Sequence, residues 1–154
     1  MDSAEAVVDL TIRDAELTDA EALAALMGEL GYKTTAAEMT ARLEAILPDL
    51  RYRTFVAILD NQLCGMIGTV AQPSHEHNDL SGRIVALVIS KPMRRRGVAR
   101  KLIAAAEKDF AKRAITRVSL TTRLTREEAH RFYEQLGYNK NGFRYAKELT
   151  RTGD

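Results

Sequence analysis

The sequence contains a single cysteine and no tryptophan, and it has no long hydrophobic run. The one cysteine, Cys64, excludes an internal disulfide and is typical of a reducing cytoplasm. No apolar stretch approaches the roughly 20 residues that a membrane-spanning helix needs. The acidic residues Asp2 and Glu5 near the start are unlike a secretion signal. These absences predict a cytoplasmic domain that does not enter a membrane.

The chain also lacks a large excess of charge. It carries 23 Lys and Arg against 21 Asp and Glu, a net charge of +2. Basic residues are concentrated between Lys91 and Lys101, and no Tyr or Phe is interleaved with them for stacking on bases. The sequence therefore argues against a nucleic-acid-binding domain and favours an anionic ligand at one place.

The hydrophobic patterns predict one domain, residues 1–154, with a core of about 8–149. Alternating or continuous apolar runs indicate strands at 7–13, 53–59, 62–70, 84–89, 115–122 and 143–149. Helical spacing predicts helices between Thr18 and Gly31, Thr35 and Pro48, Val98 and Phe110, and Thr125 and Gly137. The resulting order, βααβββαβαβ, is that of an α/β (α+β) fold with a mixed, mostly antiparallel sheet.

Short signals mark several element boundaries. The segments that begin at Thr18, Thr35 and Thr125 each have a Glu three residues later, as in a capping box at a helix start. Asp60-Asn61 between two strands predicts a hairpin. The polar stretch 73–79 predicts a loop.

The basic segment from Arg94 to Ala99 follows the apolar run 84–89 and precedes a helix. Gly97 permits a positive φ or a close approach of the backbone, and Ala99 leaves space beside the helix start. Free N–H groups and the helix dipole favour an anion there. The surrounding arginines suit a diphosphate, although a merely solvated basic helix start is the alternative. A P-loop or a dinucleotide fingerprint needs further glycines and is excluded.

Two motifs resemble those of the GNAT superfamily of N-acetyltransferases. Arg94, Gly97 and Ala99 match Arg/Gln-x-x-Gly-x-Gly/Ala after a central strand. Residues 129–138, AHRFYEQLGY, are similar to the family's A-x-x-F-Y-x-x-L-G-F segment. The expected element order also agrees with that family.

The resemblance implies acetyl-CoA as the co-substrate. Main-chain groups of a strand that splays from its neighbour would hold the pantetheine arm, and amides of the arginine segment would hold the pyrophosphate. The residues assigned to the cofactor are Leu87, Val88, Ile89, Arg94, Arg95, Arg96, Gly97, Val98, Ala99, Arg100, Lys101, Arg126 and Phe132. Arg126 stands where many members have asparagine, so it either meets a phosphate or makes no contact.

The resemblance further implies direct attack by a primary amine in a ternary complex, with Tyr133 as the general acid. Many relatives carry a catalytic glutamate at the position of Val85, which cannot accept a proton. His75, Glu76 and His77 are alternative bases. The main expectation is that water removes the proton of the amine without a dedicated residue. His75 and His77 lack a third ligand at a known spacing, so no metal is expected.

The acceptor site is assigned to the first two helices and the loop before the central strand. This nominates Glu29, Tyr32, His75 and His77 as contacts for a small-molecule or peptide amine. A catalytically weak CoA-binding sensor of the same fold is the alternative function. A homodimer is left open.

Overall fold

The computed structural model describes residues 9–122 and 127–151. They fall into two compact units, one ending at Leu120 and the other beginning at Thr121. Arg126 and the predicted capping box at Thr125 lie outside the described residues. The elements are β1 (Thr11–Asp14), η1 (Leu17–Asp19), α2 (Ala20–Leu30), α3 (Ala36–Ile46), β2 (Tyr52–Leu59), β3 (Gln62–Gln72), β4 (Ser81–Ile89), η2 (Lys91–Met93), α4 (Val98–Lys112), β5 (Val118–Ser119) and α5 (Glu127–Gln135).

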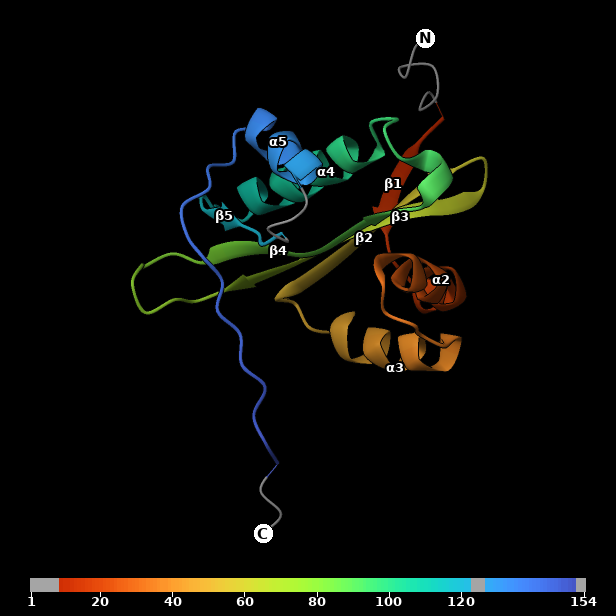
Figure 1. Cartoon of the computed structure of the whole chain (residues 1–154), viewed down its shortest axis with the longest axis horizontal. Helices are drawn as coiled ribbons and strands as arrows, with labels where there is room; N and C mark the ends of the chain where they lie inside the picture. The colour runs from red at the N-terminus through yellow and green to blue at the C-terminus, as the bar shows by residue number, and fades with distance from the viewer. Residues whose placement is uncertain (1–8, 123–126, 152–154) are drawn as a thin grey trace. The chain divides into compact units, whose positions relative to one another are not determined.

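The first unit is built on a five-stranded sheet in the order β1-β2-β3-β4-β5 (Figure 1). The first four strands are antiparallel to their neighbours, and β5 runs parallel to β4. The predicted mixed, mostly antiparallel sheet is therefore confirmed. Asp60 and Asn61, with φ of 51° and 62°, form the predicted hairpin turn between β2 and β3.

Helices cover both faces of this sheet (Figure 1). The helices α2 and α3 pack on Val56, Met66 and Val88, which share one face because they are register partners. The opposite face carries α4, whose Phe110 lies with Ala71 in a separate buried cluster. No helix of the described residues is long and apolar enough to cross a membrane.

The predicted apolar face of α4 is confirmed. The five residues at the predicted spacing are all at most 2% exposed: Val98, Leu102, Ile103, Ala106 and Phe110. An ion-pair network also joins this helix to the sheet, because Asp109 accepts hydrogen bonds from Arg53 on β2 (2.8 Å) and from Arg113 (2.6 Å). Arg53 in turn bonds Asp14 at the end of β1. The helix that follows the arginine segment is thus held by both packing and charge.

The capping box expected at Thr35 is present, since the Thr35 hydroxyl accepts from the Glu38 N–H and the Glu38 carboxylate accepts from the Thr35 N–H. The box expected at Thr18 is wrong. Thr18 lies within η1, and Asp19 instead accepts from the Glu16 N–H and from both guanidinium nitrogens of Arg13. The Arg13 hydrogen bonds hold the pKa of Asp19 below its usual value. This ion pair joins the end of β1 to η1.

Two predicted strands are shortened to a remnant or absent in the structure, and the strand predicted at 7–13 is observed as Thr11–Asp14 among the described residues. The strand expected at 115–122 is reduced to the two residues of β5. The strand expected at 143–149 is absent: this stretch has no regular structure, and Phe143, Tyr145 and Leu149 are at least 80% exposed. Its sequence alternates as a strand should, but no strand of the described residues pairs with it, and alternation without a hydrogen-bonding partner does not make a sheet.

Gly82 on β4 is required by the packing of α4. A Cβ at this position would lie 2.8 Å from Cε1 of Phe110, which is 1% exposed. We predict that Gly82→Ala lowers the free energy of unfolding by about 1–3 kcal/mol, because the buried ring cannot move away without disturbing its neighbours. Urea denaturation measures this.

Gly28 in α2 provides the matched control, since a Cβ there would meet nothing within 4 Å. Gly28→Ala is expected to leave stability unchanged or to raise it by roughly 0.5–1 kcal/mol, as for a glycine in a helix interior. Equal effects of the two substitutions would contradict the packing argument.

A hydrogen bond links α2 to the segment after β4. The Glu29 carboxylate, near the end of α2, accepts a hydrogen bond of 2.8 Å from the main-chain N–H of Lys91. Lys91 is the first residue of η2, so the bond fixes the point where the chain leaves the sheet and enters the arginine segment.

We predict that Glu29→Ala accelerates hydrogen exchange of the Lys91 amide by about tenfold, because its acceptor is removed. Glu29→Gln keeps a carbonyl oxygen in the same place and should change this rate much less. Exchange rates measured by NMR that are the same in all three proteins would show that the contact does not hold the turn.

Candidate active site

A β-bulge interrupts β4 at Val85. Gly68 of β3 pairs with Ala86, whereas the next residue, Thr69, pairs with Ile84, so Val85 is left without a partner on β3. Its side chain is 48% exposed, and its Cγ2 lies 3.6 Å from the position of a Cβ on Gly68. Bulges re-aim side chains and are common beside active sites. Val85 is the residue at which the resemblance predicted the position of the family's glutamate.

The edge of β4 that faces β5 is open along most of its length. β5 pairs only with Gly82 and Arg83, and no other strand of the described residues pairs with β4 on that side. Residues 86–89, where a splay was expected, have no strand beside them on this edge in the described part of the chain. Unpaired main-chain donors and acceptors at such an edge can bind an extended ligand as an added strand would.

The three residues expected to bind the pantetheine arm do not all direct their main-chain N–H and C=O groups to the same side of β4. The Ser90 N–H donates to the Cys64 carbonyl on β3 at 2.8 Å. Main-chain groups alternate between neighbours in an antiparallel ladder, so those of Val88 also face β3. Those of Leu87 and Ile89 face the open edge. The Ile89 carbonyl already accepts a hydrogen bond of 3.1 Å from Nε of Arg94.

The arginine segment forms a turn with two left-handed residues. Arg95 has φ of 64° and Gly97 has φ of 84°. Positive φ is natural for glycine but strained for arginine, and such strain is concentrated at functional sites. A Cβ on Gly97 would meet nothing within 4 Å, so the backbone conformation, and not the available space, calls for glycine here.

Gly97 is the N-cap of α4, and no side chain caps this helix start. The first N–H that bonds inside the helix is that of Lys101, to the Gly97 carbonyl at 3.2 Å. The amides of Val98, Ala99 and Arg100 therefore lack acceptors within the helix. The basic side chains around them are exposed to solvent: Arg94, Arg95, Arg96, Arg100 and Lys101. This arrangement suits a bound diphosphate.

The residues nominated for the acceptor lie at opposite ends of β4. Glu29 is bonded to Lys91 at the turn, and Tyr32, just beyond α2, is 59% exposed. His75 and His77 are exposed in the loop between β3 and β4, and the prediction of a loop at 73–79 is confirmed. The nine residues of β4 separate this loop from the turn by about 25 Å (Figure 1).

The histidine loop is held in place by an ion pair. Asp79 accepts a hydrogen bond of 2.9 Å from Arg117, just before β5, and this bond lowers the pKa of the Asp79 carboxyl group. The His77 N–H donates to the Ser74 hydroxyl at 3.2 Å. Among the described residues, no three His, Cys, Asp or Glu side chains are grouped as a metal site would require.

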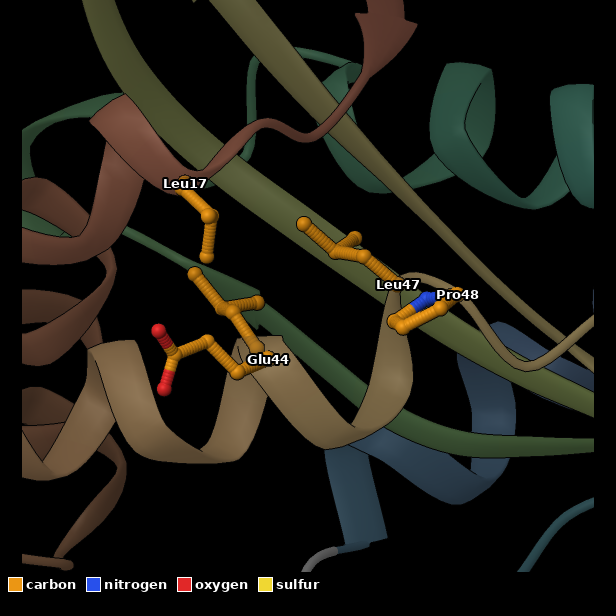
Figure 2. A pocket seen from close by; sticks show the side chains of 5 residues that line it. Leu17, Glu44, Leu47 and Pro48 are labelled. Atoms are coloured by element: carbon orange, nitrogen blue, oxygen red, sulfur yellow. The ribbon is translucent and has the colours of Figure 1, made fainter.

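An apolar hollow of about 360 Å³ lies between η1 and the end of α3, away from the segments discussed above. Figure 2 shows Leu17 and Leu47 pointing into it, with the Glu44 carboxylate at its rim. None of its lining residues was predicted as functional.

Tyr133 and Phe132 lie on α5 in the second unit. Their rings pack edge to face with centroids 5.4 Å apart, and Tyr133 meets Tyr138 in the same way at 6.1 Å. The helix ends as predicted, with Gly137 at φ of 94°. The Phe-Tyr motif thus forms an aromatic cluster within its own unit.

Sequence reasoning overlooked Arg83. It lies two residues before the bulge, and its side chain is exposed. The apolar run that predicted the central strand begins at Ile84, whereas β4 begins at Ser81. A charged residue at an alternating position just before the apolar run is the signal that could have identified it.

Comparison with known proteins agrees with this geometry. A model of the acetyltransferase (GNAT) family matches residues 20–138. An aminoalkylphosphonate N-acetyltransferase of Salmonella typhimurium is 31% identical over 143 residues, which cover 90% of each chain.

Solved structures show the same fold at lower identity. A GNAT family acetyltransferase of Staphylococcus aureus is 24% identical with a TM-score of 0.79, covering 91% of this chain and 98% of that one. Glucosamine-6-phosphate N-acetyltransferase of Arabidopsis thaliana is 19% identical with a TM-score of 0.80, covering 92% and 99%. With a family model over most of its length and a relative matched over 90% of both chains, this chain belongs to the acetyltransferase (GNAT) family.

Proposed function

We propose that this enzyme transfers the acetyl group of acetyl-CoA to the primary amine of a small molecule that carries a phosphonate or phosphate group. The observation that carries the proposal is the 31% identity, over nine tenths of both chains, to an aminoalkylphosphonate N-acetyltransferase. The fold is also shared with an enzyme that acetylates glucosamine 6-phosphate. Both named substrates combine an amine with a phosphorus oxyanion.

In this proposal, two consecutive segments of the chain bind the cofactor. Main-chain groups of Leu87 and Ile89 bind the pantetheine arm at the open edge of β4, and the amides from Arg94 to Ala99 bind the pyrophosphate. The exposed cations around the turn neutralise its charge. Both parts lie on one run of chain, β4 and the turn that follows it.

Transfer is direct, from thioester to amine. The amine nitrogen forms a bond to the carbonyl carbon, the carbon–sulfur bond breaks, and the thiolate takes a proton. The chain offers no thiol for a covalent intermediate, because its one cysteine, Cys64, is 4% exposed and burial raises the pKa of its thiol. Because Val85 supplies no base, we propose that water accepts the proton of the amine. We also propose that the reaction takes place in a reducing cytoplasm.

A panel of amines tests the proposal. Release of CoA thiol from acetyl-CoA is measured with 2-aminoethylphosphonate, glucosamine 6-phosphate, propylamine and a lysine peptide. We expect kcat/KM for one of the phosphorus-containing amines to exceed that for propylamine by about tenfold or more, as one charge-assisted hydrogen bond would give. A protein that binds acetyl-CoA, seen as a rise in Tm, but releases no CoA with any amine would be the sensor instead.

Tyr133 is proposed as the acid that protonates the departing thiolate. Tyr133→Phe removes the phenol and keeps the ring, so we predict that kcat falls by about 10²-fold while the Kd for acetyl-CoA stays the same. Tyr138→Phe is the matched control, because it removes a phenol from the same aromatic cluster. Equal kinetics for the two variants would exclude Tyr133 as the acid.

A further inference from the structure

Arg83 occupies a defined place on the sheet. It pairs with Val70 on β3 and with Ser119 on β5, so it lies at the last position where β5 accompanies β4. Immediately beyond it come Ile84 and the bulge residue Val85. Arg83 therefore lies at the residue of β4 where the open edge begins.

The register also fixes the face on which Arg83 lies. Arg83 pairs with Val70, and Val70 with Tyr52, so these three residues form one row across the sheet. Four rows further along, Val88 and Met66 are buried under α2 and α3. Residues of alternate rows share a face, so Arg83 lies on the face of α2 and α3, at a place that these helices leave exposed.

The side chain of Arg83 has no partner among the described residues. It makes no hydrogen bond or ion pair in the described part of the chain. Within residues 9–122, every other arginine has at least one hydrogen bond, ion pair, ring contact or other electrostatic interaction: Arg13, Arg42, Arg51, Arg53, Arg94, Arg95, Arg96, Arg100, Arg113 and Arg117. The acidic residue nearest to it along the chain, Asp79, is bonded to Arg117.

We infer that Arg83 is the binding residue for the phosphorus oxyanion of the acceptor. This inference rests on the proposed function, which places the thioester along the open edge beyond the bulge. Two strand residues, about 7 Å, separate Arg83 from Val85, and a short aminoalkylphosphonate spans a similar length. A guanidinium can bind two oxygens of a phosphonate or a phosphate monoester at once.

The same arrangement explains why valine at position 85 suits an anionic acceptor. A carboxylate at position 85 would place a negative charge near the bound oxyanion and would repel it. Valine at the bulge leaves the guanidinium of Arg83 as the charged group on that part of β4. The absence of the family's glutamate and the presence of Arg83 thus favour the same anionic acceptor.

Binding is tested directly, apart from turnover. The Kd of 2-aminoethylphosphonate, and separately of phosphoethanolamine, is measured by calorimetry with the CoA-bound protein. Arg83→Gln should weaken binding of the preferred ligand by about tenfold or more, and Arg83→Lys by less, because lysine keeps the charge but not the two-point contact. Preference for one ligand identifies the phosphonate or the phosphate monoester as the natural group.

Arg51→Gln is the matched control. Arg51 is an exposed arginine just before β2, bonded to Asp49, and its loss should leave both Kd values unchanged. Arg83→Gln should also leave the Kd for acetyl-CoA and the kcat/KM for propylamine unchanged, which a general loss of structure would not do. A wild-type protein that binds neither ligand, or an Arg83→Gln protein that binds both as well as wild type, would overturn the inference. Failure of the proposed function appears separately, as absence of turnover with every amine.

Discussion

The main-chain hydrogen bonds of β4 are the constraint on which the candidate site depends. One edge of this strand pairs with β3 at every residue except Val85, whereas the other meets β5 at only two residues. Buried donors and acceptors without partners are costly in a protein. An edge left open beside a core strand is therefore a place where a ligand can gain free energy by completing the ladder. The bulge at Val85 bends the strand where the two edges begin to differ.

The rest of the first unit keeps this open strand in position. Phe110 packs against Gly82 at one end of β4, and Glu29 bonds to Lys91 just past the other end. Between them, the buried face of α4 and the Asp109 ion pairs fix the helix that follows the turn. Packing and hydrogen bonding from both faces thus hold a strained, strongly basic loop, which by itself would have little reason to adopt one conformation.

Local signals predicted much of this fold. Helical spacing identified the buried face of α4, and Thr35 with Glu38 marked the start of α3, because both depend on residues within one or two turns. Thr18 failed because the ion pair of Asp19 with Arg13 links two elements, and no local pattern reveals it. The expected strand at 143–149 failed for a related reason: alternation is local, whereas strand pairing is not.

The candidate site divides in the same way. The turn from Arg94 to Ala99 could be read from the sequence because a glycine, a helix start and clustered cations are all neighbours in the chain. The bulge at Val85 depends on the register with β3, and the exposure of Arg83 depends on where α2 and α3 end on the sheet. Neither is visible without the tertiary structure, so the sequence pointed to the first two helices and the loop before the central strand for acceptor residues, and not to Arg83 on the strand itself.

The central claim is that the open edge of β4 and the turn after it form one binding surface for acetyl-CoA. Titration of acetyl-CoA into ¹⁵N-labelled protein, followed by amide chemical shifts, tests it most directly. We expect the largest shifts at Leu87, Ile89 and the amides from Arg94 to Ala99, and a smaller shift at Val88 because its N–H faces β3. Saturable binding that leaves these amides unchanged would contradict it.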